Sequence, residues 1–280
     1  MASGTFLPGT SIEIINDGIE RGKVRFALFD FDGTLSLIRE GWPSVMIPMM
    51  VEVLAPVAQG LPRERVEAMM TADVEETTGR PTIDQMIRLA SRVAEFGGSP
   101  RDPKEYKAEY IRRLMKHIAR RRESLAAGAV APDQMLLPGV RPLLEALASR
   151  GLVMVAASGT DEPYVREEAR LVDVARYFGP HIYGARDDYE ASSKAAVIAR
   201  LLAENRIRGE ELVVFGDGFV EIVNAKEVGG YAVGVASDEA AGGGRINAWK
   251  RNRLLQAGAD VIVPDFAEHE ALVRLLFGRA

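Results

Sequence analysis

The chain has 280 residues, of which 47% are hydrophobic and 27% are charged, and it contains no cysteine. This composition is typical of a globular protein with one large domain or two ordinary ones, and it excludes a disordered or fibrous chain. The lack of cysteine excludes disulfides, thiolate nucleophiles and cysteine-ligated zinc, and the formal net charge of −5 excludes a chain-wide basic footprint for nucleic acid.

The chain opens with a segment whose pattern is weak. Residues 1–10 lack the basic and apolar regions of a signal peptide, so we expect no secretory leader and a cytoplasmic protein, which also suits the absence of cysteine. Residues 11–25 are expected to form a small hairpin that turns at Asp17-Gly18. An entirely apolar strand follows at Phe26–Phe29 and ends at Asp30.

Residues 38–136 show four helical patterns and no convincing strand, near residues 42–59, 62–71, 83–96 and 103–126. Gly and Pro clusters separate these patterns, and the whole stretch is far longer than an ordinary crossover between strands. We therefore expect an all-α domain at 38–136, inserted into a core made of 1–37 and 137–280. The most apolar run, Val45–Ala58, is too short and too often interrupted to span a bilayer, so we expect no membrane partner.

The last of these helices, Pro103–Ala126, carries eight Lys or Arg residues. Such a helix could contact nucleic acid, but three Glu residues are interleaved with the cations and four apolar residues form a stripe along it. The pattern favours a solvated helix face over a nucleic-acid partner.

After the insertion, apolar strands alternate with amphipathic helices. The expected strands are Leu152–Ala156, Leu212–Phe215, Tyr231–Val235 and Asp260–Val263, with a weaker one at His181–Tyr183. Residues 140–147 and 197–202 each place their apolar side chains on one helical face. This alternation predicts an α/β fold with a Rossmann-like, doubly wound parallel sheet.

Polar residues stand at the carboxyl ends of three predicted strands, where open α/β sheets bind ligands. Segment 30–34 follows the first strand, segment 158–160 a second, and segment 216–218 a third, with Glu221 one helical turn later. Converging carboxylates repel one another unless a cation holds them. Oxygen ligands without His or Cys favour Mg²⁺ over zinc.

These segments resemble, in order, the four motifs of the haloacid dehalogenase (HAD) superfamily of phosphohydrolases. FDFDGTL at 29–35 is similar to the first motif and VMVAASGT at 153–160 to the second. Lys194 resembles the third motif, and VVFGDGFVEI at 213–222 resembles the fourth. The resemblance covers residues 24–37 and 137–235, and the insertion lies where the family carries its helical cap of the C1 type.

The resemblance implies that Asp30 is a nucleophile that forms an aspartyl-phosphate, with Mg²⁺ as cofactor. It implies that Asp32 is the general acid and base, and that its backbone carbonyl binds Mg²⁺. Dehalogenases of the superfamily lack an acid at this position, because halide leaves unprotonated, whereas a leaving alkoxide needs a proton. Asp32 therefore favours phosphate esters as substrates.

The remaining motif residues are expected to bind phosphate or metal. The resemblance assigns Ser158, the amide of Gly159, Gly33 and Thr34 to phosphate, although Ser158 could instead be an ordinary helix N-cap. Lys194 would pair with the nucleophile and the phosphate. Ser192 or Ser193 is expected to cap its helix, so its charge opposes the helix dipole unless an anion lies nearby, and the alternative is a solvated surface lysine.

The fourth motif is expected to bind the metal through Asp217. Glu221 stands where many members of the family have a second Asp. It would bind Mg²⁺ directly, bind it through water, or only hold Lys194.

The resemblance thus implies a Mg²⁺-dependent phosphatase for a small phosphorylated metabolite, such as a sugar or polyol phosphate. The alternatives are a phosphomutase on the same scaffold and a non-catalytic binding module. The non-catalytic module is disfavoured because five motif residues are intact: Asp30, Asp32, Ser158, Lys194 and Asp217. Arg39, next to the first motif, and Arg80, in a loop of the insertion, are nominated as substrate contacts. Their alternatives are a solvated linker residue and a surface turn. The sequence leaves the oligomeric state open.

Overall fold

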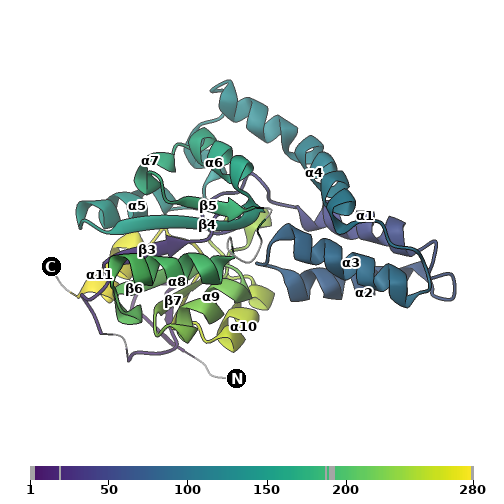
Figure 1. Cartoon of the computed structure of the whole chain (residues 1–280). Helices are drawn as coiled ribbons and strands as arrows, with labels where there is room; N and C mark the ends of the chain where they lie inside the picture. The colour runs from purple at the N-terminus through teal and green to yellow at the C-terminus, as the bar shows by residue number, and fades with distance from the viewer. Residues whose placement is uncertain (1–3, 19, 187, 189–192, 279–280) are drawn as a thin grey trace.

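The computed structural model describes residues 4–18, 20–186, 188 and 193–278. Its centre is an eight-stranded sheet with the strand order β1-β2-β8-β7-β6-β3-β4-β5 (Figure 1). The parallel strands are β3 (Phe26–Phe29), β4 (Val153–Asp161), β5 (Ile182–Ala185), β6 (Leu212–Gly216), β7 (Tyr231–Val235) and β8 (Val261–Val263). In the middle of the sheet, Leu28 of β3 aligns with Val155 of β4 and Val214 of β6.

Helices cover both faces of this sheet, which is why its central strands are continuous apolar runs. Alternate residues of β3 point to opposite faces: Phe29 packs in one hydrophobic cluster, where its ring stacks on Phe215, and Leu28 packs in the other. The first cluster includes α5 (Val140–Ser149), α6 (Glu162–Leu171), α7 (Ala175–Phe178) and α11 (His269–Phe277). The second includes α8 (Lys194–Asn205), α9 (Phe219–Glu227) and α10 (Ala248–Ala257). The predicted doubly wound α/β fold is therefore confirmed.

The four predicted helices between β3 and β4 are present as α1 (Pro43–Leu54), α2 (Arg63–Thr77), α3 (Thr82–Glu95) and α4 (Pro103–Ala126). Residues 38–136 are all described and contain no strand. The helices lie together beside the carboxyl ends of the parallel strands (Figure 1). Tyr106, Tyr110 and Leu114 of the predicted apolar stripe are buried on α4. That the insertion is a separate domain stays a prediction.

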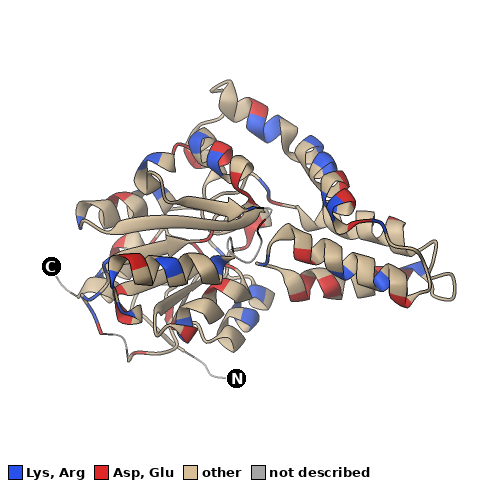
Figure 2. Ribbon diagram, in the orientation of Figure 1, with Lys and Arg blue, Asp and Glu red and all other residues tan. Residues whose placement is uncertain are grey.

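The basic residues of α4 are not simply solvated, as the sequence pattern suggested. Acidic residues lie among them and opposite them (Figure 2). Lys107 forms an ion pair with Asp161 at the start of α6 at 2.5 Å, and Arg122 pairs with Glu167 of α6 at 2.6 Å. These ion pairs therefore help to hold α4 against the core. The cations of α4 do more than keep one face of the helix in contact with water.

The N-terminal hairpin is present, but its predicted position was wrong. β1 (Thr5–Phe6) pairs antiparallel with β2 (Glu13–Ile14), and β2 adds antiparallel to the edge strand β8. Asp17-Gly18 lies beyond β2 in irregular structure. The physical reason is tertiary: Glu13 is buried and pairs with Arg251 of α10, so the sheet edge rather than the local turn signal sets the register.

β4 runs five residues beyond its predicted end at Ala156, and its pairing with β5 shifts register between Ala157 and Asp161. Segment 158–160 therefore lies within the irregular end of a strand, not in a loop after it. The residue that precedes α6 is Asp161, so Ser158 is not the cap of that helix. None of the described helices combines the length and the apolar character that a membrane span requires.

Candidate active site

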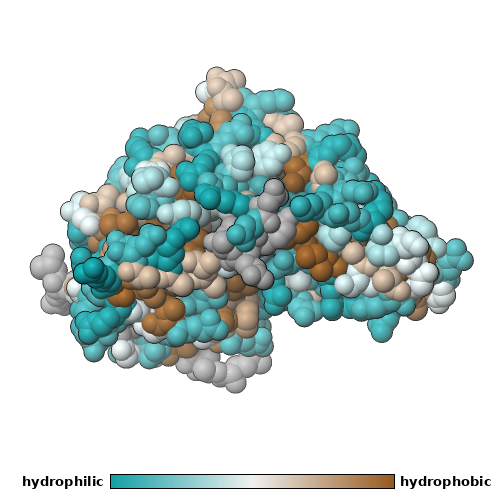
Figure 3. All heavy atoms as spheres, viewed as in Figure 1, coloured by the Kyte–Doolittle hydropathy of each residue, from teal (hydrophilic) through white to brown (hydrophobic). Residues whose placement is uncertain are grey.

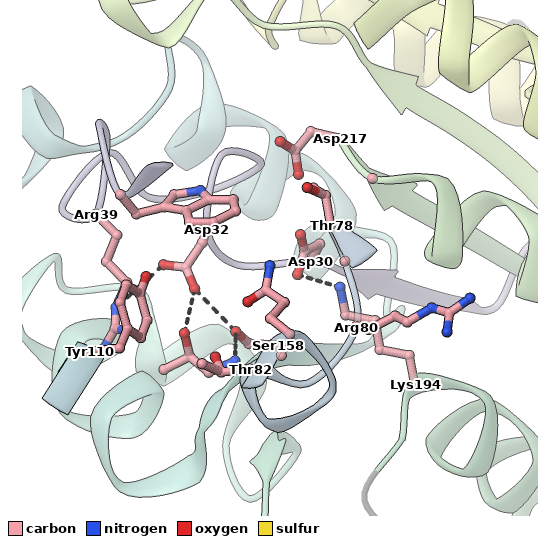
Figure 4. Close-up of a pocket in the computed structure, with 16 residues that line it drawn as sticks. Asp30, Asp32, Arg39, Thr78, Arg80, Thr82, Tyr110, Ser158, Lys194 and Asp217 are labelled. Atoms are coloured by element: carbon pink, nitrogen blue, oxygen red, sulfur yellow. Dashed lines mark hydrogen bonds and ion pairs between the residues drawn. The ribbon is translucent and has the colours of Figure 1, made fainter. Parts of the chain in front are cut away.

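Eight of the eleven predicted site residues line one pocket at the carboxyl ends of β3, β4 and β6 (Figure 4), whereas Gly33, Thr34 and Glu221 are not among its lining residues. Its volume is about 90 Å³. The core lines it with the predicted residues Asp30, Asp32, Ser158, Gly159, Lys194 and Asp217. The insertion and its linker contribute Arg39, Trp42, Thr78, Gly79, Arg80, Thr82, Gln85 and Tyr110.

Asp30 and Lys194 form a buried ion pair at the base of the pocket. The Lys194 ammonium donates a hydrogen bond to Oδ1 of Asp30 at 2.7 Å and also pairs with Glu221, which is fully buried. Ser193 caps α8 by accepting a hydrogen bond from the amide of Ala196, whereas Ser192 lies outside the described residues. The positive charge of Lys194 in the first helical turn opposes the helix dipole, but the carboxylates of Asp30 and Glu221 compensate for this. Because Lys194 is buried, the alternative of a solvated surface lysine does not fit.

The charge state of Asp30 depends on what else occupies the site. Burial raises the pKa of the Asp30 carboxyl to about 7; Lys194 opposes this rise, while Asp217 and Asp32 add to it. A carboxylate must be ionised to act as a nucleophile. A cation bound between these acids would hold Asp30 in that form.

Asp32 is oriented by two hydroxyl groups of β4. Its Oδ2 accepts hydrogen bonds from Ser158 Oγ at 3.2 Å and from Thr160 Oγ1 at 2.9 Å (Figure 4). Its other oxygen, Oδ1, is buried and accepts no hydrogen bond from a described residue. Oδ1 is therefore the Asp32 oxygen that no described hydroxyl group holds, and its charged neighbour is the Arg39 guanidinium, with Nε 3.8 Å away.

Sequence reasoning missed Thr160 as a site residue. Ser158 and Thr160 are two residues apart on a strand, so their side chains share one face. The signal that would have found Thr160 is this spacing, but it applies only if β4 is known to continue through the segment.

Gly33 and Thr34 build the contact between the β3 and β6 loops. Gly33 has a φ of +76°, and a Cβ there would lie 2.5 Å from Oδ2 of Asp217, so no other residue fits. The Thr34 hydroxyl accepts a hydrogen bond from the amide of Asp217 at 3.0 Å. The predicted contact of both residues with phosphate stays a prediction.

Lys250 of α10 is a second functional residue that sequence reasoning missed. Its ammonium donates hydrogen bonds to Oδ2 of Asp217 at 2.7 Å and to Oε1 of Glu239 at 2.5 Å. It comes from a part of the chain beyond all four motifs. An isolated lysine on a polar helix gives no sequence signal that would have identified it.

The two nominated arginines both line the pocket but differ in environment. Arg39 is buried, and its guanidinium forms a two-point interaction with the fully buried Glu168 at 2.9 and 2.8 Å. Its Nε lies 3.8 Å from Oδ1 of Asp32. Arg80 is exposed, and its backbone carbonyl packs so closely on Gly159 that a Cβ there would lie 2.6 Å away. Their contact with substrate stays a prediction.

The donor set of the site fits Mg²⁺. No three His, Cys, Asp or Glu side chains within the described ranges are grouped as a ready metal cage. Mg²⁺, however, usually takes only one or two carboxylates, keeps several waters and adds substrate phosphate oxygens. Asp217 is close enough to Asp30 to raise the pKa of the Asp30 carboxyl, and Oε2 of Glu221 is buried without a hydrogen bond from the described residues.

Comparison with known proteins gives one family. Residues 24–229 match the model of the haloacid dehalogenase-like hydrolases. A 5′-nucleotidase from Pseudomonas aeruginosa is 29% identical over 103 residues, which are 37% of this chain and 46% of that protein. The chain therefore spans about half the length of the curated relative it matches.

Solved structures share the fold over nearly the whole chain. A hydrolase from Pseudomonas syringae has a TM-score of 0.58 at 17% identity, and the match covers 91% of this chain and 100% of that one. A predicted phosphoglycolate phosphatase from Haemophilus somnus has a TM-score of 0.56 at 18% identity, with 89% and 98% covered. At such low identity these matches establish the fold alone.

Proposed function

The chain belongs to the haloacid dehalogenase-like hydrolases, and from this premise we propose that it is a Mg²⁺-dependent phosphatase of small phosphomonoesters. The observation that carries the proposal is the presence of Asp30, held by Lys194, beside a second acid, Asp32, whose Oδ1 accepts no hydrogen bond from a described residue. The 5′-nucleotidase relative is named for a phosphomonoester substrate, which supports the same class.

Asp30 is the nucleophile of the first step. Its carboxylate oxygen attacks phosphorus, the bond from phosphorus to the ester oxygen breaks, and an aspartyl-phosphate forms. Lys194 holds Oδ1 of Asp30, so the carboxylate does not need to reorient before attack. Mg²⁺, held by Asp30, Asp217 and the Asp32 carbonyl that the family resemblance implies, would neutralise charge on the phosphoryl oxygens.

Asp32 transfers the protons of both steps. It gives its proton to the departing ester oxygen, and then takes a proton from the water that attacks the aspartyl-phosphate, which releases phosphate and restores Asp30. The hydrogen bonds from Ser158 and Thr160 fix Oδ2, so Oδ1 is the oxygen that carries the proton.

The turn between α2 and α3 covers part of the pocket. Arg80 and Gly159 are in backbone contact there, and Gly79, with a φ of +91°, packs against Val220 of α9. Such a cover would limit the access of bulk water to the reacting groups.

The test is phosphate release from a panel of alkyl and aryl phosphate esters, with Mg²⁺ and with EDTA, by the wild type and Asp32→Asn. We expect Mg²⁺-dependent release, and in the variant a loss on alkyl esters that exceeds the loss on nitrophenyl phosphate by roughly 10²-fold or more, because nitrophenolate leaves without a proton. Isomerisation without phosphate release would instead identify a phosphomutase. Absence of any turnover across the panel would contradict the proposal.

A further inference from the structure

A second pocket, of about 340 Å³, adjoins the catalytic one. The linings of the two pockets share Trp42, Thr78 and Asp217, so the pockets are neighbours at these residues. The second pocket lies between α1 and α2 on one side and segment 237–250, which follows β7, on the other. Because its volume exceeds that of the catalytic pocket, it is the adjacent space that could take the rest of a substrate.

Aromatic side chains are concentrated in this second pocket. The chain has two Trp residues, and both Trp42 and Trp249 line it. Trp249 is 42% exposed. The face of the molecule in Figure 3 is mainly hydrophilic, with several hydrophobic patches. The guanidinium of Arg253 lies over the indole ring of Trp249, 4.9 Å from the ring centroid. An exposed, fixed indole is a stacking surface for a planar ring.

The rim of the pocket is acidic. Glu40, Glu75, Asp238 and Glu239 contribute carboxylates, and the ammonium of Lys250 is already engaged by Asp217 and Glu239. Glu75 forms no ion pair and accepts no side-chain hydrogen bond within the part of the chain that the structure describes. Ionised carboxylates only accept hydrogen bonds and repel anions, so a matching ring carries N–H donors and no negative charge.

We propose that this pocket binds a nucleobase with an exocyclic amino group, and that the substrate is therefore a nucleoside monophosphate. The base would stack on Trp249 and donate to Glu75, while the phosphate would lie toward Asp30, on the side where both pockets are lined by Trp42 and Thr78. A polyol has no planar face, and its phosphate would leave both indoles unused. The substrate assignment rests on the proposed phosphatase function, whereas the base-binding pocket itself is open to a test without catalysis.

The test measures binding of adenosine, which has the base but no phosphate. Because both Trp residues line the pocket, intrinsic tryptophan fluorescence reports on it directly. We expect a saturable change with adenosine, about 10-fold weaker binding of purine riboside because its base has no amino group and no ring N–H, and no change with ribose. Isothermal titration calorimetry provides the second measurement of each affinity.

Three variants separate stacking from hydrogen bonding. Trp249→Ala should weaken adenosine binding by roughly 5- to 150-fold, the usual effect of losing one stacking partner. Glu75→Leu, which removes the acceptor, should abolish the preference for adenosine over purine riboside. The matched control is Ile87→Ala, which changes a 48% exposed apolar residue of α3 outside the pocket and should bind adenosine like the wild type.

The outcomes distinguish the subsite from the catalytic proposal. Absence of saturable adenosine binding, equal affinity for purine riboside, or wild-type affinity in Trp249→Ala would overturn the subsite, even if sugar phosphates are hydrolysed. Adenosine binding with these preferences, in an enzyme that hydrolyses no phosphate ester, would support the subsite and contradict the phosphatase.

Discussion

Lys250 donates a hydrogen bond to Asp217 at 2.7 Å, so the acid of the fourth motif is paired with a cation from α10, outside all of the motifs. The same ammonium reaches Glu239 and the hydroxyl of Ser237, and that hydroxyl donates to the carbonyl of Gly33. One lysine thus links the β6 loop, the β7 loop and the loop of the nucleophile. We interpret Lys250 as a positioning residue for Asp217.

Replacing Lys250 with Met should lower kcat/KM about 10-fold, because loss of a residue that orients a metal ligand typically costs 10- to 100-fold. It should also lower the free energy of unfolding by about 2 kcal/mol, because two partly buried carboxylates lose their hydrogen-bond donor. Steady-state kinetics and urea unfolding measure the two effects. The control is Lys226→Met, which breaks a similar pair with Asp260 away from the site and should reduce stability alone. Equal kinetic effects of the two substitutions would remove the positioning role.

Thr160 should matter for the proton that Asp32 carries. Thr160→Val keeps the shape but removes the donor to Oδ2, so turnover of alkyl esters should fall roughly 10-fold, the loss expected for one hydrogen bond to a charged group. Nitrophenyl phosphate, which needs no proton, should be affected much less. Thr160→Ser restores the hydroxyl and should recover most of the activity. Equal losses on both ester types would show that Thr160 does not act through Asp32.

A buried acid in the insertion makes its stability depend on pH. Asp73 is 2% exposed; burial raises its pKa, but hydrogen bonds from Arg92 and Arg88 outweigh burial and leave the pKa below its ordinary value. A lowered pKa in the folded state adds stability at neutral pH, and this stability is lost as the pH falls through that pKa. Asp73→Ala should therefore cost about 3 kcal/mol at pH 7 and less at pH 3, measured by urea unfolding. A cost that is the same at both pH values would contradict the ion-pair account.

The sequence contained enough local information for the parallel strands and the motif residues. Phe26–Phe29 is buried on both faces, so its apolar run identified the strand, and its end located Asp30 and Asp32. The residues that were missed depend on tertiary contacts instead. Thr160 acts only because β4 continues past Ala156, and Lys250 lies 33 residues from the Asp217 that it contacts. The two-point interaction of Arg39 with Glu168 links positions 129 residues apart, which no local pattern could indicate.

The covalent role of Asp30 is the central claim, and trapping of the intermediate tests it most directly. The enzyme is mixed with a phosphate ester and Mg²⁺, quenched in acid and reduced with borohydride, which converts an aspartyl-phosphate into homoserine. Peptide mass spectrometry should then find homoserine at position 30, and Asp30→Asn should show none while keeping the wild-type unfolding curve. An enzyme that turns over its substrate with unmodified Asp30 at every quench time, or an active Asp30→Asn variant, would contradict the account.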